Sequence, residues 1–187
     1  MSKKTCIILV GPPCSGKSAT GKLTASKMNI EYISSGDIAR EMAKYNAQIG
    51  IDLSVGMMAP EVEMRKRIDN KLWYNFIKND RDIVILDGFP RFGDQAKWLR
   101  TILPATINIL YVMFDTSSQV IAKRSIDRNR EDDKSIEKRL EYYLAVTFPE
   151  LCKHINHYIN TDNNTIEECS ELLIEYIKEV TDIVKDC

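Results

Sequence analysis

The most informative stretch of the sequence is GPPCSGKSA, at residues 11–19. Its letters fit the pattern G-x-x-x-x-G-K-[ST], which ends at Lys17 and Ser18. The apolar run TCIILV at 5–10 precedes it, and a segment with helical periodicity at 16–28 follows it. A phosphate-binding loop needs this context, because its backbone N–H groups and the positive start of the helix wrap the phosphates. A chance match at an ordinary strand-to-helix turn is the alternative.

Two side chains of this stretch fit the chemistry of a nucleoside triphosphate. The Lys17 ammonium can reach the terminal phosphates, and the Ser18 hydroxyl can hold Mg²⁺. Cys14 stands close to the start of a helix, where thiols can be reactive. Because no base accompanies it in the sequence, we interpret Cys14 as a small loop-filling residue.

The rest of the chain alternates short apolar runs with segments of helical periodicity, which is typical of an α/β fold. Most of the apolar runs lack polar alternation, as buried parallel strands do. Strands are expected at 5–10, 32–34, 82–87, 108–114 and 157–160. Helices are expected at 16–28, 36–46, 60–78, 94–101, 117–129, 134–155 and 165–185.

Length and composition fit one globular domain spanning 1–187, with 44% hydrophobic and 28% charged residues. A net charge of −1 gives no general attraction to nucleic acid or to an acidic membrane. No apolar run of about 18 residues occurs, and the start of the chain does not read as a signal peptide. Five cysteines without a C-x-x-C pair disfavour a disulfide framework and a zinc knot. We therefore expect a reduced, cytoplasmic protein without nucleic-acid or membrane partners.

Two further stretches favour phosphoryl transfer. In ISSGDIAR, at 33–40, a short strand ends at Gly36 and Arg40 lies one helical turn beyond it. In LDGFPR, at 86–91, Asp87 ends a buried strand. A carboxylate there can orient the water shell of Mg²⁺, and Arg91 is placed to bind a second phosphate.

A third stretch, RSIDRNREDDKSIEKR, supplies four arginines over residues 124–139. Arg124 and Arg128 are four apart on a helical pattern, Arg130 follows at a turn, and Arg139 belongs to the next helix. Taken singly, each arginine fits an ordinary exposed charge. Together they can surround a charged phosphoryl group during its transfer, and the joint pattern favours that role.

These stretches, in this order, resemble the adenylate kinase family of nucleoside monophosphate kinases. The family's strings GxPGxGKGT, hSTGDhhR, G-x-L-V-P/T-D-E, DGFPR and R-x-x-x-R-G-R-x-D-D appear as GPPCSGKSA, ISSGDIAR, GMMAPE, LDGFPR and RSIDRNREDD, before EKRLEYY. The resemblance covers nearly the whole chain. It implies a three-layer fold like that of P-loop nucleoside triphosphate hydrolases, with five parallel strands in the order 2-3-1-4-5. It also implies a monophosphate-binding insert at about 35–64 and a short lid at about 128–134.

The activity implied is transfer of the γ-phosphoryl group of ATP–Mg²⁺ to a nucleoside monophosphate, foremost AMP, by a monomer without structural zinc. The implied catalytic residues are Lys17, Asp87, Arg91, Arg128, Arg130 and Arg139. The implied ATP site contains Pro12, Pro13, Cys14, Ser15, Gly16, Lys17, Ser18, Ala19, Arg124 near the base and Arg128 from the lid. The implied monophosphate site contains Ser35, Arg40, Met57, Met58, Ala59, Gly88, Phe89, Pro90, Arg91, Gln95, Arg130 and Arg139. Ser18 and Asp87 are the implied Mg²⁺ residues. Asp132 and Asp133 are implied lid carboxylates that pair with the site arginines when the lid closes.

The chain departs from the family pattern at three places. Ser18-Ala19 replaces Gly-Thr after the loop lysine, Asn129 replaces a lid glycine, and Ser35 replaces threonine. We expect Ser18 to retain a metal contact. Ser35 preserves the hydroxyl of the threonine that it replaces.

The accepted base depends on Ser35 and Gln95. Adenylate kinases read adenine with the STGD hydroxyl and a glutamine four residues after the DGFPR arginine, whereas UMP/CMP kinases tend to have Ala and Asn. A glutamine presents a donor and an acceptor together, as adenine requires. We therefore favour AMP. For Gln95 itself, the alternative is a solvent-facing position on a helix. For the whole protein, the alternatives are a UMP/CMP kinase and a P-loop switch or ATPase without an acceptor.

Overall fold

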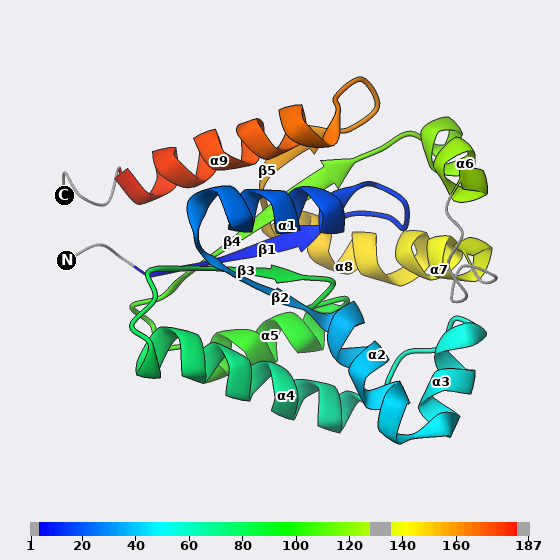
Figure 1. Ribbon diagram of the computed structural model, residues 1–187, viewed down its shortest axis with the longest axis horizontal. Coiled ribbons are helices and arrows are strands. Elements are labelled where there is room, and N and C mark those ends of the chain that lie inside the picture. The colour runs from blue at the N-terminus through cyan, green and yellow to red at the C-terminus, as the bar shows by residue number, and fades with distance from the viewer. Residues whose placement is uncertain (1–3, 128–135, 183–187) are drawn as a thin grey trace.

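The computed structural model describes residues 4–127 and 136–182 (Figure 1). A five-stranded sheet forms its centre, and every strand pairing in it is parallel. The strand order is β2-β3-β1-β4-β5, which confirms the expected order. The strands are β1 (Thr5–Val10), β2 (Glu31–Ser34), β3 (Ile83–Asp87), β4 (Asn108–Asp115) and β5 (Ile155–Asn160).

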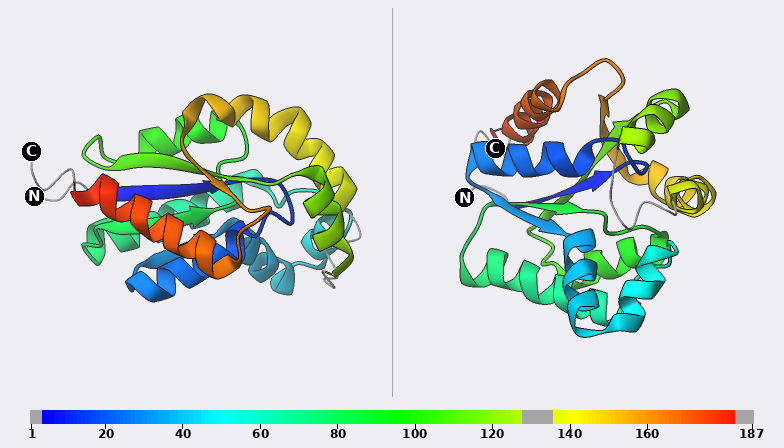
Figure 2. Two further views of the ribbon diagram at one scale, coloured as in Figure 1. Left: turned by 90° about the horizontal axis from the view of Figure 1, so that it is seen from above. Right: turned by 45° about the vertical axis from the view of Figure 1, so that its right-hand side comes forward.

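Helices cover both faces of this sheet, as the two views of Figure 2 also show. One face carries α1 (Lys17–Met28) and α9 (Ile166–Asp182), and the other carries α4 (Glu61–Trp73) and α5 (Gly93–Ile102). The strand β1 is buried throughout, so its alternate side chains pack into the two separate cores. The apolar run of the sequence is therefore explained by burial on both faces.

The segment after β2 contains one helix more than the sequence analysis expected. Here α2 (Ser35–Tyr45) is followed by α3 (Ala47–Ser54). Asn46 ends α2, and its Oδ1 then accepts a hydrogen bond from the backbone N–H of Gln48 at 3.0 Å. This contact caps α3. The expected helix at 60–78 is present as α4 and a π-helical segment, η1 (Tyr74–Lys78).

The expected helix at 134–155 is a chain of shorter helical segments. These are α7 (Ile136–Tyr142), the π-helical η3 (Tyr143–Thr147), α8 (Phe148–Leu151) and the 3₁₀ turn η4 (Cys152–His154). Pro149 lacks a backbone N–H, which explains the irregular helical bonding beside it. Before them, α6 (Ser118–Asp127) follows β4. Within the described ranges, no helix is long and apolar enough to cross a membrane.

The register of the sheet brings three sequence motifs to one edge. Leu9 of β1 and Ser34 of β2 both pair with Asp87 of β3. The carboxyl ends of these strands therefore lie together, and the segments that leave them start side by side. Open parallel sheets bind ligands at this edge, outside the point where neighbouring crossovers diverge.

Candidate active site

Residues 11–16 form a tight loop between β1 and α1. Gly11 has φ +157°, and a Cβ there would lie 2.9 Å from the backbone oxygen of Phe114. Gly16 has φ +86° and stands directly before α1. Cys14 also has a positive φ, 62°, and it is buried. This conformation presents the loop N–H groups and the start of α1 to an anion.

The residues predicted for ATP at 12–19 lie in or beside this loop. Pro12, Pro13, Cys14 and Ser15 are buried, and Ala19 is exposed on the first turn of α1. Lys17 Nζ donates to the Pro12 carbonyl at 3.2 Å, so the ammonium lies at the loop. The predicted lid lies outside the described residues, and with it Arg128, Asn129, Arg130, Asp132 and Asp133.

Arg124 extends from α6 to the back of the loop. Its guanidinium donates to the Thr161 carbonyl at 2.6 Å and to Thr161 Oγ1 at 3.1 Å. It also donates to the Ser15 carbonyl at 3.5 Å. These bonds join α6, the loop and the end of β5. The structure thus brings Arg124 to the predicted donor site.

Asp87 accepts two short hydrogen bonds on one oxygen. Ser18 Oγ donates to Oδ2 at 2.5 Å, and the Tyr32 hydroxyl donates to the same atom at 2.6 Å. Asp87 Oδ1 is buried and lacks a hydrogen-bond partner among residues 4–127 and 136–182. Burial, followed by the charge of Asp87, raises the pKa of the Tyr32 hydroxyl well above its ordinary value. Tyr32 therefore stays a hydrogen-bond donor near neutral pH.

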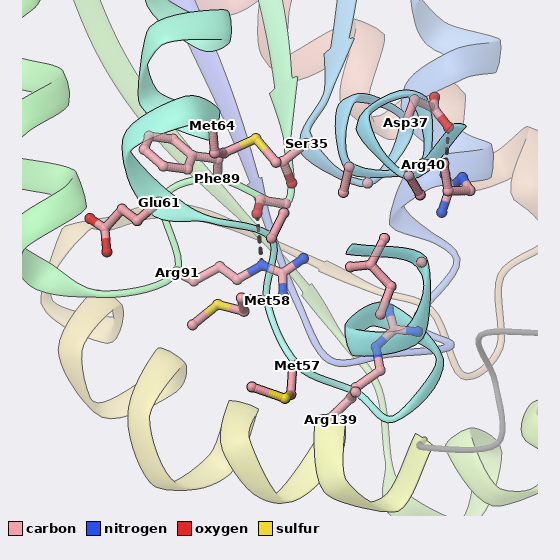
Figure 3. Close-up of a pocket in the computed structure, with 18 of the residues that line it drawn as sticks. Ser35, Asp37, Arg40, Met57, Met58, Glu61, Met64, Phe89, Arg91 and Arg139 are labelled. Carbon is pink, nitrogen blue, oxygen red and sulfur yellow. Dashed lines mark hydrogen bonds and ion pairs between the residues drawn. The ribbon is translucent and has the colours of Figure 1, made fainter. Parts of the chain in front are cut away.

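A cavity of about 590 Å³ opens beside this site, between the sheet edge and the α2–α3 segment (Figure 3). Arg40 reaches it from α2, Arg91 from the β3–α5 loop and Arg139 from α7. Met57, Met58, Ala59 and Phe89 give it apolar walls, and Ser35, Gly88 and Gln95 also line it. Pro90 lines the adjoining cavity instead. The structure therefore gathers the predicted monophosphate residues that it describes.

A second cavity, of about 260 Å³, connects the two predicted sites. Gly11, Pro13 and Lys17 line it from the phosphate-binding loop. Arg91 and Arg139 line both this cavity and the larger one. Lys17 and these two arginines consequently face a common space, where a phosphoryl group could pass from one ligand to the other.

Arg91 is fixed by the chain that surrounds it. Its Nε donates to the Gly88 carbonyl at 3.0 Å. Burial, and next the charge of Arg139, lower the pKa of the Arg91 guanidinium. The two cations repel each other at the cavity, and a bound phosphate would relieve this repulsion.

Gln95 is buried, with 5% of its surface exposed, so the solvent-facing alternative is wrong. Its Oε1 accepts a hydrogen bond from the backbone N–H of Arg91 at 2.8 Å. Its amide NH₂ is left as the donor toward the cavity. Ser35 Oγ, on the same cavity, is buried and has no partner in the described part of the chain.

Among the residues of this region that the sequence analysis missed are Lys22 and Tyr32. Lys22 lines the larger cavity, and its Nζ lies 3.0 Å from Asp37 Oδ2. Arg40 donates to the other oxygen of Asp37 at 2.5 Å. Burial would raise the pKa of Asp37, but hydrogen bonds from Arg40 and Lys22 lower it below its ordinary value. No sequence signal marks Lys22, since the rotation of α1 decides which of its lysines faces the cavity.

A phosphate-binding loop and a separate cationic cavity that share a connecting space define a P-loop phosphotransferase with donor and acceptor sites. Comparison with known proteins specifies the family. A family model described as adenylate kinase matches residues 9–162. The chain belongs to the adenylate kinase family, and it is an ATP-dependent nucleoside monophosphate phosphotransferase.

Individual relatives agree with this assignment. Adenylate kinase 1 of Nostoc sp. is 32% identical over 153 residues, which cover 78% of this chain and 82% of the relative. The adenylate kinase of Rickettsia africae is 29% identical over 96% of this chain and 98% of the relative. The adenylate kinase of Corynebacterium aurimucosum is 29% identical over 90% of this chain and 96% of the relative. The similarity thus spans both candidate sites.

Proposed function

We propose that this chain transfers the γ-phosphoryl group of ATP to AMP and so forms two ADP. The observation that carries the proposal is the cavity shared by Lys17 of the loop and by Arg91 and Arg139 of the acceptor side. A nucleotide switch or a hydrolase needs no second phosphate site. The cationic acceptor cavity therefore favours a monophosphate as the second substrate.

Adenine is the base that the acceptor cavity fits best. Met58, Met64 and Phe89 offer apolar surface to a flat ring. The amide NH₂ of Gln95 can donate to a ring nitrogen of adenine, and Ser35 Oγ adds a hydroxyl that needs a partner. A buried polar group left without a partner costs about 1–3 kcal/mol, so bases that do not pair with these groups bind less well.

The protein contributes alignment and positive charge rather than proton transfer. The acceptor phosphate is already ionised at neutral pH, so no general base is required. Lys17 binds the terminal phosphates of the donor, while Arg40, Arg91 and Arg139 bind the acceptor phosphate and the transferred group. Held in line, the two nucleotides react without a further chemical group from the chain.

Mg²⁺ is the proposed cofactor, because it neutralises phosphate charge and orients the phosphates. The donor set fits it. Asp87 Oδ1 is buried without a partner in the described ranges, and Ser18 Oγ lies beside the same carboxylate. Mg²⁺ usually keeps several of its waters, and a carboxylate oxygen in this position can hold that water shell. Ser18 supplies a hydroxyl ligand.

The insert at 35–64 is the proposed monophosphate-binding part, since α2, α3 and the segment before α4 line the acceptor cavity. The proposed lid at 128–134 supplies Arg128 and Arg130. Its closure, with that of the insert, would exclude the water that otherwise takes the phosphoryl group. We further propose a cytoplasmic monomer without structural zinc and without nucleic-acid or membrane partners.

The proposed function is tested by the stoichiometry of the reaction. Purified protein is mixed with ATP and Mg²⁺, with and without AMP, and all adenine nucleotides and inorganic phosphate are quantified. We expect two ADP for each ATP and AMP consumed, and little phosphate release. Equal ATP consumption without AMP, with phosphate as a product, would contradict the proposal. Repeating the reaction with EDTA tests the role of Mg²⁺.

A further inference from the structure

Tyr32 belongs to β2, the strand that leads into α2 at the acceptor cavity. Its hydroxyl nevertheless reaches the predicted donor site. Tyr32 lies two residues before Ser34, which pairs with Asp87 in the sheet. A Cβ on Gly21 of α1 would lie 2.8 Å from ring atom Cε2 of Tyr32. The glycine therefore allows the ring to pass close to α1, so that the hydroxyl reaches Asp87 Oδ2 at 2.6 Å.

The Tyr32 hydroxyl changes which carboxylate oxygen is available. A carboxylate oxygen has two lone pairs, and both lone pairs of Asp87 Oδ2 are used by Tyr32 and Ser18. The terminal torsion of an aspartate is broad, so the carboxylate needs such contacts to hold one orientation. With Oδ2 occupied, Oδ1 is the buried oxygen left to accept a hydrogen bond.

We propose that Tyr32 is a positioning residue for phosphoryl transfer, because its hydroxyl holds Asp87 with Oδ1 directed to the water shell of the bound metal. The inference rests on the proposed function of Asp87 toward Mg²⁺. The Ser18 hydroxyl can donate to Oδ2 while a lone pair of its oxygen serves the metal, so Ser18 and Tyr32 act together on this oxygen. Two donors on Oδ2 fix the carboxylate more firmly than Ser18 alone.

A role in core packing alone would need the ring and not the hydroxyl. Tyr32→Phe keeps the ring beside Gly21 and removes only the donor. Tyr176→Phe is the matched control, because Tyr176 is buried in the same core cluster against which Tyr32 packs. Its ring stacks on His157, at 4.2 Å between centroids, away from both cavities.

The test measures Mg²⁺ dependence in binding and in transfer. ATP affinity is determined by calorimetry with and without Mg²⁺, and the rate of ADP formation is determined across a Mg²⁺ titration. For Tyr32→Phe we expect the Mg²⁺-dependent gain in ATP affinity to shrink by about tenfold, as for loss of one hydrogen bond to a charged group. The Mg²⁺ concentration for half-maximal rate should rise, while KM for AMP stays unchanged. Tyr176→Phe should behave as the wild type.

The outcomes separate this inference from the proposed function. If the wild type transfers equally well in EDTA, the proposed role of Mg²⁺ is wrong. If the wild type needs Mg²⁺ and Tyr32→Phe shows the wild-type Mg²⁺ response in both measurements, the role of Tyr32 is wrong.

Discussion

The side-chain oxygen of Gln95 accepts a hydrogen bond from the backbone N–H of Arg91 at 2.8 Å. One residue thereby joins the proposed base-binding end of the acceptor cavity to the loop that carries a phosphate-binding arginine. The same bond fixes the amide, so that its NH₂ is the half left to meet a base.

Gln95→Glu separates these two tasks. A glutamate keeps an oxygen for the Arg91 N–H but replaces the donor to the base by an acceptor. We expect kcat/KM for AMP to fall about 10- to 100-fold, because the carboxylate faces a ring nitrogen that cannot donate. UMP, whose ring N–H can donate, should lose less. Gln119→Glu, on the exposed surface of α6, is the control. An equal loss for both acceptors would contradict a role for Gln95 in reading the base.

Lys17→Met removes the proposed contact with the transferred phosphates. Its removal should lower kcat by a factor of 100 or more, on the order of 3 kcal/mol in the barrier, as for other preorganised charges. The free energy of unfolding should change little, since Lys17 is only half-buried. Lys27→Met on the same helix, where Lys27 pairs with Glu171, is the control. Turnover within a few-fold of the wild type would exclude Lys17 from the mechanism.

Lys22→Gln probes the ion pairs of Asp37. With Lys22 present, Asp37 keeps one cation when Arg40 turns to a phosphate. We therefore expect KM for AMP to rise several-fold in Lys22→Gln while KM for ATP stays constant, and Lys22→Arg to restore it. Steady-state kinetics at two ionic strengths measure both KM values. Because salt screens the ion pair, the difference in KM for AMP between the wild type and Lys22→Gln should be smaller at the higher ionic strength. A rise confined to KM for ATP would contradict this role of Lys22. An equal rise of KM for AMP in the control Lys27→Gln would contradict it as well.

Gly88→Ala tests the turn that follows Asp87. Gly88 has φ +75°, and a Cβ there would lie 2.6 Å from Ser35 Oγ. The left-handed backbone alone should lower the free energy of unfolding by about 1–2 kcal/mol, and displacement of Ser35 should raise KM for AMP. Gly50→Ala in α3 is the control, because a Cβ there would lie 3.8 Å from Ala43 Cβ, which is an ordinary contact. It should leave the free energy of unfolding unchanged or raise it. Denaturant unfolding compares them, and equal stability of the two variants would contradict the argument.

The sequence predicted the elements whose signals are local. Burial of β1 on both faces appears as an unbroken apolar run, and the phosphate-binding loop appears as a fixed spacing of Gly11, Gly16 and Lys17. The family resemblance added the strand order. By contrast, α3 begins at a cap formed by Asn46, and its short segment has no clear helical periodicity.

Side-chain partners were less predictable, because they depend on register and helix rotation. That Tyr32 reaches Asp87 follows from the pairing of β2 with β3 and from the space at Gly21. That Lys22 faces the cavity follows from the rotation of α1. Gln95 was predicted to contact the base, but its bond to the Arg91 N–H depends on the path of the loop between them.

We propose that Ser35 and Gln95 make the acceptor cavity select adenosine monophosphate. The most direct test is kcat/KM of the wild-type protein for AMP, dAMP, GMP, CMP and UMP, at fixed ATP and Mg²⁺, from the rate of ADP formation. We expect kcat/KM for AMP to exceed the values for CMP and UMP by at least about tenfold, since each mismatched buried polar group costs about 1–3 kcal/mol. A preference for CMP or UMP over AMP would contradict it.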